Sequence, residues 1–485
     1  MTRGGQNASS RLPIPDQTHD AVVVVPGIMG SELIDNRSGR TLWGMNDLSW
    51  YVRAWSTGSG LDDLRMTEEE RGGRYGRVTA TRLLKLPAFF RIFAGWEPYT
   101  GLVADIRKAV IHPAAVLEFA YDWRLPIAYN GARLAQEARD HLDRWRTRPA
   151  HETGRRRHPD GRRAQLVFVA HSMGGLLTRH AQSVIADKED IRATITLGTP
   201  FYGSAKATWL LNTGRGAWLP ARKSLKAAVQ RRADEGLRKL VATLPGVHDL
   251  LPVYRCLAEG QTSRRLTPAD VEALGGDREL AANAIDWHAS MEKVRLINHR
   301  AVVGVRQPTA ASLRLTDGVV TLEGRDYGGP SDGKTRMGDG TVSRGSASLA
   351  GAQFTYLPQQ HTSLAKTDEV VSHVVGVLTE QDEDQGPSLG TGELGMELPD
   401  LVLPGETFVV RITGIEHPVD ASVEFIELAT GGGPQADPVV DRDGRFEADL
   451  RAPRPGLFRV RVRGGGAGPA VEQLVLAVDP DAEAG

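Results

Sequence analysis

Short runs of continuous apolar residues recur between residues 21 and 378, with helical patterns between them. Continuous apolarity, rather than alternation, is typical of strands that are covered on both faces. The order therefore predicts an α/β fold with a parallel sheet. The predicted strands are residues 21–25, 115–120, 166–170, 193–197, 301–305 and 354–357. The predicted helices are residues 130–146, 174–186 and 367–379.

The chain changes character near residue 381. With 485 residues it is too long for one ordinary core, so two domains are expected. Residues 381–395 are acidic and rich in Gly, Pro and Ser, which predicts a linker. Alternating segments between turn signals follow, and they predict a β-sandwich of immunoglobulin-like type at 396–485. The other predicted parts are a flexible N-terminus (1–20) and the α/β domain (21–380).

Charge and cysteine content exclude several classes of protein. Lys and Arg (59) nearly balance Asp and Glu (60), which argues against nucleic-acid binding. The basic residues at 155–157 and 162–163 are predicted to lie in a solvated loop. Cys256 is the single cysteine, so no intramolecular disulfide can form. With no recognisable signal peptide or membrane-spanning stretch, we expect a cytoplasmic protein.

Residues 169–175, Val-Ala-His-Ser-Met-Gly-Gly, connect a predicted strand to a predicted helix. A strained turn at this place presents a serine hydroxyl above the sheet, and small neighbours let strand and helix approach. Ala170 replaces the usual first glycine of the G-x-S-x-G pattern. A helix cap is the alternative role of Ser172. The context predicts that Ser172 is a nucleophile on an α/β-hydrolase fold.

The turn after the first strand, Pro-Gly-Ile-Met-Gly-Ser at 26–31, is a second signal. Acyl transfer needs backbone N–H groups aimed at the developing oxyanion. In this fold, one comes from the residue after the nucleophile and another from the loop after an early strand. The predicted oxyanion hole therefore comprises Met173 with Ile28 or Met29, and a plain turn is the alternative.

The acid and base should follow the serine in that order. Asp339 lies in a Gly-flanked loop after a late strand, and His361 follows the final strand. The imidazole would move the serine proton, and the carboxylate would fix its tautomer. Several rivals remain, and of these we expect His171 to support the turn and His373 to pack within a helix. The rivals are Asp317, Asp326 and Asp332 for the acid, and His171 and His373 for the base.

These motifs resemble the lecithin:cholesterol acyltransferase family. The resemblance rests on residues 26–31, 121–125, 170–174, 197–204 and 338–342 and spans roughly 21–378. It implies an α/β-hydrolase fold and a serine acyl-enzyme that transfers a fatty acyl group from a lipid ester to an alcohol or water. Matched residue by residue, it makes Ser172 the nucleophile, Asp339 the acid and His361 the base. The secreted animal members have a signal peptide and a disulfide-tethered lid. We expect neither here, because no signal peptide is recognisable and a single cysteine cannot form the disulfide.

Segments around the motifs add predictions about the substrate. Insertions at about 42–99 and 203–291 are expected to cover the active site. Asp122, Trp123 and Tyr202 are candidates for substrate binding, whereas a structural ion pair between Asp122 and Arg124 is the alternative. Residues 82–93 are apolar with spaced cations, which suits an interfacial lid that meets lipid or a segment packed under the covering subdomain.

The sequence thus predicts a serine-dependent lipid esterase, phospholipase or O-acyltransferase without metal or organic cofactor. The expected partners are a lipid or other acyl-ester substrate and a lipid surface, and no nucleic acid. A thioesterase or amidase with the same three residues is one alternative. The others are a binding or scaffold protein on a degenerate hydrolase fold, and an effector that uses its sandwich to recruit a partner.

Overall fold

The computed structural model describes residues 17–44, 62–84, 99–214, 226–325, 337–381, 394–399, 401–429, 435–464 and 470–477. It has a mixed α/β architecture with a central six-stranded sheet in the order β13-β10-β7-β6-β1-β5. All neighbouring strands in this sheet are parallel, as predicted. The strands are β1 (Ala21–Val25), β5 (Val116–Glu118), β6 (Leu166–His171), β7 (Ile191–Leu197), β10 (His299–Gly304) and β13 (Gln353–Leu357).

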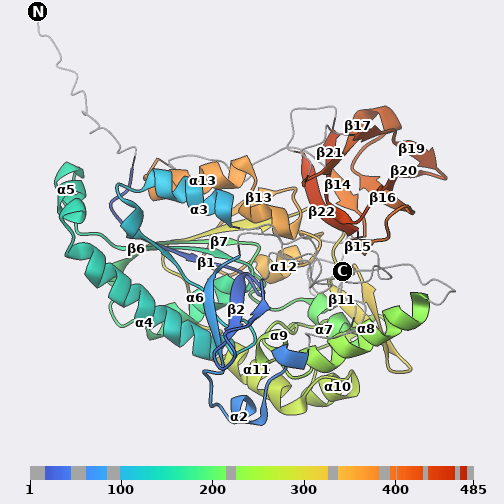
Figure 1. The fold of residues 1–485 in the computed structure, drawn as a ribbon, viewed down its shortest axis with the longest axis horizontal. Helices are drawn as coiled ribbons and strands as arrows, with labels where there is room; N and C mark the ends of the chain where they lie inside the picture. Colours follow the sequence, from blue (N-terminus) through green and yellow to red (C-terminus); the bar gives the residue numbers. More distant parts are fainter. Residues whose placement is uncertain are drawn as a thin grey trace, which may run out of the picture.

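Helices cover both faces of this sheet, which is why its strands are continuously apolar. Every residue of β1 and β6 is buried. Helices α4 and α6 pack together on one face, and α3 and α13 pack together on the other (Figure 1). Each predicted helix is present, with ends shifted by a few residues. The helices are α3 (Thr100–Ala109), α4 (Ile127–Arg146), α5 (Pro149–Arg157), α6 (Met173–Val184) and α13 (Asp368–Leu378).

A second group of elements lies between β7 and β13. It contains short helices, as expected for the 203–291 insertion, and a four-stranded sheet in the order β12-β11-β8-β9. The hairpin β11–β12 belongs to this sheet but lies beyond residue 291, so the group is longer than predicted. Its elements are α7 (Ala205–Thr213), α8 (Lys226–Val241), α9 (Pro245–His248), β8 (Leu257–Glu259), β9 (Thr262–Arg264), α10 (Pro268–Ala273), α11 (Arg278–Ser290), β11 (Ser312–Thr316), β12 (Val319–Glu323) and α12 (Arg344–Ala347).

A smaller sheet, in the order β3-β2-β4, follows β1. Its strands are β2 (Ser31–Asp35), β3 (Thr41–Trp43) and β4 (Val78–Leu83), and the helix α2 (Glu68–Arg71) precedes β4. Residues 45–61 and 85–98 lie outside the described residues. The predicted lid segment 82–93 therefore falls largely outside them as well.

The C-terminal strands form two sheets around their own hydrophobic cluster. The orders are β14-β16-β20-β19 and β15-β22-β21-β17-β18. Residues from both sheets, such as Val410 and Val460, are buried in this cluster. The strands are β14 (Gly395–Glu397), β15 (Leu401–Val402), β16 (Thr407–Thr413), β17 (Ala421–Glu427), β18 (Gln435–Asp437), β19 (Val440–Arg442), β20 (Arg445–Arg451), β21 (Gly456–Gly464) and β22 (Val471–Ala477). β14 begins at the last residue of the predicted linker, whose residues 382–393 lie outside the described part.

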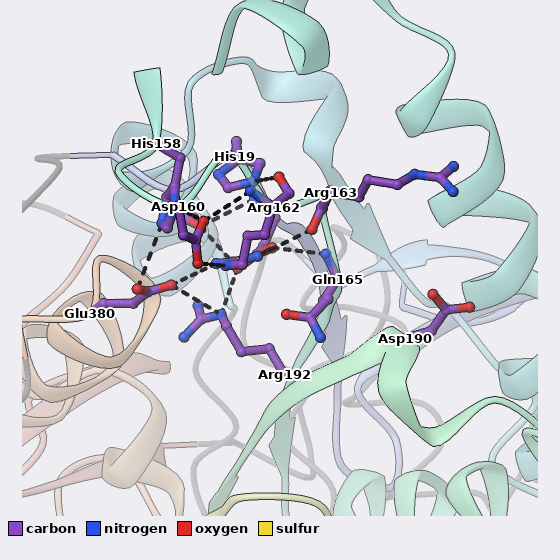
Figure 2. A network of polar contacts seen from close by, with 12 residues as sticks. His19, His158, Asp160, Arg162, Arg163, Gln165, Asp190, Arg192 and Glu380 are labelled. Carbon is purple, nitrogen blue, oxygen red and sulfur yellow. Dashed lines mark hydrogen bonds and ion pairs between the residues drawn. The ribbon is translucent and has the colours of Figure 1, made fainter. Parts of the chain in front are cut away.

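A buried ion-pair network joins the amino ends of the central strands to the end of α13. The Asp20 carboxylate, just before β1, accepts hydrogen bonds from Arg162 at 2.6 and 2.8 Å and from Arg192 at 2.5 Å. Arg192 also donates to the carbonyl oxygens of Val377 and Leu378. Glu380 lies 2.6 Å from Arg162, and the charged groups converge in Figure 2. The network holds four parts of the chain together at the amino ends of the central strands: the residue before β1, the loop before β6, the start of β7 and the end of α13.

Two expectations from the sequence need correction in part. Residues 18–20 are buried rather than part of a flexible end, because Thr18 pairs with the end of α3 and Asp20 meets two arginines. The basic residues at 155–157 end helix α5, and the Arg162 guanidinium is mostly buried against Asp20. Residues 155–157 are therefore helical rather than in a loop, although Arg156 and Arg157 are exposed, whereas Arg162 and Arg163 do lie in a loop, in which Arg163 is exposed. Burial alone would raise the pKa of Asp20, but the two arginines hold it well below its ordinary value.

Among the helices of the described residues, none combines the length and the apolar character needed to cross a bilayer.

We expect Asp20→Asn to lower the free energy of unfolding by about 3–5 kcal/mol, because two largely buried arginines lose their carboxylate. Urea denaturation at neutral pH measures this change. Asp62→Asn is the control, since the Asp62 side chain is 74% exposed in its ion pair with Arg65. The control should cost less than about 1 kcal/mol. Equal losses in both variants would contradict the role given to the network.

Candidate active site

Ser172 lies at the sharp turn between β6 and α6. Its backbone angles, φ 52° and ψ −126°, are rarely adopted by residues with a side chain, and such strain is concentrated at functional sites. A Cβ atom on Gly174 would lie 2.5 Å from the Pro26 carbonyl oxygen. Only glycine therefore lets α6 start so close to the loop after β1. The turn has the geometry that the sequence motif predicts.

Two loops from late in the chain bring a carboxylate and an imidazole to this serine. The Ser172 Oγ atom is 2.9 Å from His361 Nε2, and His361 Nδ1 is 2.7 Å from Asp339 Oδ2. The three residues are 4%, 3% and 1% exposed, respectively. Because the carboxylate only accepts, the imidazole proton lies on Nδ1, which leaves Nε2 to accept from the serine hydroxyl.

The Asp339 carboxylate is fixed by its own loop. Its Oδ1 atom accepts from the backbone N–H groups of Thr341 at 3.0 Å and Val342 at 2.7 Å. The His361 N–H donates to the Asp339 carbonyl at 2.8 Å, so the acid and base loops are also joined through the backbone. These bonds leave Oδ2 directed at the imidazole.

Gly198, at the end of β7, makes room for the Asp339–His361 pair. It has a φ of 59°, and a Cβ atom there would lie 2.9 Å from Asp339 Oδ2 and 3.1 Å from His361 Nδ1. In the sequence, Gly198 is marked only as part of the 197–204 motif of the family resemblance. A glycine at the carboxyl end of a strand next to the nucleophile strand was the available signal.

The rival candidates lie elsewhere or have other partners. Asp317 is in the turn between β11 and β12, with an exposed side chain. His373 is buried on α13, as expected. Asp326 and Asp332 lie outside the described residues. Of the described rivals, only His171 is next to the serine.

His171 connects the loop after β1 to the base loop. The Gly27 N–H donates to the Tyr99 hydroxyl at 2.8 Å, which lies 2.9 Å from His171 Nδ1. His171 Nε2 lies 3.1 Å from the His361 carbonyl oxygen. Since a carbonyl only accepts, Nε2 carries the proton and Nδ1 accepts from the tyrosine. Tyr99 was missed because no motif marks it at the end of a predicted insertion.

Burial, together with the nearby His361 ring, lowers the pKa of His171 to about 3. His171 is therefore neutral near pH 7. A neutral imidazole with both nitrogens engaged holds its neighbours in place, which agrees with the supporting role expected for it.

The oxyanion candidates Ile28 and Met29 occupy a tight turn closed by a hydrogen bond from Gly30 to Gly27 at 3.1 Å. Met29 has a φ of 64°, and its carbonyl oxygen accepts from the Trp43 indole at 2.9 Å. Met173 is the first residue of α6, where N–H groups have no acceptor within the helix. The turn and the start of α6 are neighbours, because Gly174 packs on the carbonyls of Val25 and Pro26.

Asp122 lies in a buried ion pair. Its oxygens accept from Arg124 Nε at 3.0 Å and Nη2 at 2.7 Å, and Arg124 also contacts Glu70 at 2.9 Å. Burial opposes the charge on Arg124, but the two carboxylates outweigh it and raise its pKa. This arrangement is the structural alternative considered for Asp122, since its carboxylate is taken up by the protein.

Trp123 and Tyr202 contact residues around the site. The Trp123 ring is fully buried and meets Trp43 edge-on, with 5.4 Å between centroids. Trp43 in turn holds Met29, so Trp123 backs the loop after β1. Tyr202 is partly buried in the loop after β7, where its N–H lies 3.4 Å from Ser346 Oγ. Within the described residues, neither side chain is hydrogen-bonded to Ser172.

Within the described part of the chain, no group of three or more His, Cys, Asp and Glu side chains is placed to hold a metal ion.

A family model described as lecithin:cholesterol acyltransferase matches residues 93–246. The resemblance to the lecithin:cholesterol acyltransferase family is confirmed over this segment. The matched segment contains Ser172, Met173 and the Asp122–Arg124 pair, whereas Asp339 and His361 lie beyond it. No curated protein matches the chain.

Two solved structures are similar to the chain at 15% identity. One, "The crystal structure of Tle4-Tli4 complex", has a TM-score of 0.46 and covers 75% of this chain and 99% of that chain. The other is the Bacillus licheniformis lipase BlEst2 in propeptide form, with a TM-score of 0.29. That match covers 96% of this chain and 73% of the lipase chain.

We expect His171 to make the protein less stable in acid. An unfolded histidine binds a proton near pH 6.5, whereas buried His171 does so only near pH 3. Between these values the unfolded state binds more protons, so stability falls as the pH is lowered. From pH 7 to pH 5, His171 should lower the free energy of unfolding by about 2 kcal/mol.

Urea denaturation of His171→Gln at both pH values measures this contribution. The variant should show a pH dependence smaller than wild type by that amount. The control Gln182→Leu removes a buried side chain that contacts Thr194 and Ile297, so it should be destabilised at both pH values with the wild-type dependence. If the free energy of unfolding of His171→Gln depends on pH as strongly as that of wild type, the assignment of a buried, neutral imidazole is contradicted.

Proposed function

We propose that the chain is a serine-dependent enzyme that hydrolyses lipid acyl esters or transfers their acyl group to an alcohol. The observation that carries the proposal is the continuous hydrogen-bonded series from Ser172 Oγ through the His361 ring to Asp339 Oδ2. A serine hydroxyl is a weak nucleophile unless a base is in hydrogen-bond contact with it and a third group orients that base. Both conditions are met here.

In the acylation step, His361 Nε2 takes the proton of Ser172 as Oγ attacks the ester carbonyl carbon. The resulting imidazolium is stabilised by Asp339, and the oxyanion is held by N–H groups of Met173 and of Ile28 or Met29. His361 then gives its proton to the leaving alkoxide as the carbon–oxygen bond breaks. The products of this step are an alcohol and an ester of Ser172.

In the second step, water or an acceptor alcohol attacks the acyl-enzyme. His361 takes the proton of the attacking hydroxyl and returns a proton to Ser172 Oγ as the acyl group leaves. The outcome depends on whether water or an alcohol occupies the site, because both react in the same way.

The family match supports the lipid substrate, since lecithin and cholesterol are the lipids in the family's name. The architecture supports an α/β-hydrolase domain with a covering subdomain, followed by a β-sandwich of immunoglobulin-like type. The near-complete burial of Ser172 supports a covered site, which a substrate enters only after the covering segments move. We also propose contact with a lipid surface during that entry, and a cytoplasmic location.

The test is p-nitrophenyl ester hydrolysis across acyl lengths. Ser172→Ala and Asp339→Asn should each lower kcat by about 10⁴-fold, because one removes the nucleophile and the other favours the wrong imidazole tautomer. Asp317→Asn and His373→Gln are matched controls on the rival residues and should keep wild-type rates. Preference for long chains over short ones is expected for a lipid substrate.

Thioester and anilide substrates in the same assay separate the alternatives. Faster turnover of either class than of esters would replace the lipid ester with that substrate class. Equal rates in wild type and Ser172→Ala would contradict the nucleophile. No Ser172-dependent turnover of any of these substrates would favour a binding protein on a degenerate hydrolase fold.

A further inference from the structure

The residues on either side of His361 are hydrogen-bonded to the C-terminal strands. The Gln359 side chain donates to the Ala470 carbonyl at 3.0 Å and accepts from the Glu472 N–H at 3.3 Å. The Ser363 hydroxyl donates to the Glu472 carbonyl at 2.8 Å. Both partners are backbone groups at the start of β22. Gln359, two positions before His361, and Ser363, two positions after it, are thus both hydrogen-bonded to the same C-terminal strand.

A second set of bonds joins β14, a strand of the other C-terminal sheet, to both the base loop and the acid loop. Gln360 Nε2 donates to the Met396 carbonyl at 2.6 Å and to Gln307 Oε1 at 3.1 Å. Gln307 Oε1 also accepts from the Met396 N–H at 3.0 Å, and Gln307 Nε2 donates to the Leu394 carbonyl at 3.2 Å. The backbone of Gln307 pairs with Gly338 and Asp339. Gln307 therefore connects β14 to the residue proposed as the acid.

These contacts are buried. Gln307, Gln359 and Ser363 are 0% exposed, and Gln360 is 9% exposed. A buried amide that loses its partner cannot be satisfied by water, so each side chain requires the C-terminal backbone at this position. β22 packs directly on the short helix η4 (His361–Ala365) that begins with the proposed base. Figure 1 shows the C-terminal strands, in orange and red, next to β13, the strand that leads into this loop.

We propose that the C-terminal β-domain positions the catalytic histidine. Backbone groups at the starts of β14 and β22 hold the loops of Asp339 and His361 at the distances that the proton transfer needs. They do so through hydrogen bonds to the side chains of Gln307, Gln359, Gln360 and Ser363. The three glutamines and Ser363 are positioning residues, since they act through His361 and Asp339. The inference rests on the proposed serine-hydrolase function and extends it by giving the C-terminal domain a part in the active site.

Amide side chains suit this task for a physical reason. Each glutamine both donates and accepts, so one side chain can satisfy an N–H and a carbonyl of the same strand end. Gln359 does this with β22, and Gln307 does it with β14. The bonds fix the position of the loop along the strand as well as its separation from it. A shift of about 1 Å in the base can cost about 10²-fold in rate, so modest loosening should be measurable.

The experiment compares full-length Gln359→Leu and Gln360→Leu with wild type and Gln182→Leu. Gln182 is buried on the nucleophile helix and bonds Thr194 and Ile297, so it matches the loss of a buried glutamine without touching the His361 loop. Two properties are measured: p-nitrophenyl ester kinetics, and hydrogen–deuterium exchange of peptides covering 353–365. Exchange in peptides covering 166–184 and 394–477 reports whether the rest of each domain stays folded.

We expect Gln359→Leu and Gln360→Leu to lower kcat by about tenfold or more at unchanged KM, because the base is displaced while the acyl-binding surface is kept. Exchange at 353–365 should rise, while the nucleophile segment keeps wild-type protection. Gln182→Leu should be less stable but keep wild-type kcat and wild-type exchange at 353–365. Gln360→Glu, which keeps the shape but loses the two donors, should behave like Gln360→Leu.

Faster exchange at 353–365 with wild-type kcat would overturn the proposal, because the contacts would then be a simple attachment. Unchanged exchange at 353–365 would also overturn it. If wild type itself shows no Ser172-dependent hydrolysis, the proposed function fails, whereas the exchange data still decide whether the C-terminal strands hold the loop.

Discussion

The strained backbone of Ser172 is the constraint around which the site is arranged. With φ at 52°, the chain leaves β6 and enters α6 within one residue, which directs the hydroxyl away from the sheet. That turn is tolerated because its surroundings over-determine it. Gly174 lets α6 approach the loop after β1, and the Ser172 N–H donates to the Leu197 carbonyl at 2.9 Å. The strain therefore depends on both neighbouring strands of the central sheet.

Two polar connections convert this turn into a complete site. On one side, Tyr99 and His171 join Gly27 of the loop after β1 to the carbonyl of His361. On the other side, buried glutamines join the loops of Asp339 and His361 to the C-terminal strands. Buried hydrogen bonds of this kind are individually modest, but an unmet partner in a low-dielectric interior is costly. The geometry at Ser172 thus depends on hydrogen bonds between parts of the chain that are hundreds of residues apart.

The central sheet and the Ser172 turn could be predicted because their signals are local. Continuous apolar runs report burial on both faces, and a serine followed by glycines reports a tight strand-to-helix turn. Asp339 and His361 could be ranked only by their order, since the contact that joins them is not local. Tyr99, Gln307 and Gln359 could not be predicted, because a tyrosine or glutamine becomes significant only once folding has brought a backbone partner to it. Arg162 was misassigned for the same reason, since Asp20 lies 142 residues away in sequence.

We propose that Ser172 is a nucleophile activated by His361, and covalent labelling is the test of this activation. A fluorophosphonate reacts with a serine hydroxyl only when a base removes its proton, so it reports activation without knowledge of the substrate. The measurement is peptide mass spectrometry of wild type, His361→Gln and His373→Gln after equal exposure to the probe. We expect a label on Ser172 in wild type and in His373→Gln, and loss of the label in His361→Gln. A label on another serine, or equal labelling of Ser172 in all three proteins, would contradict it.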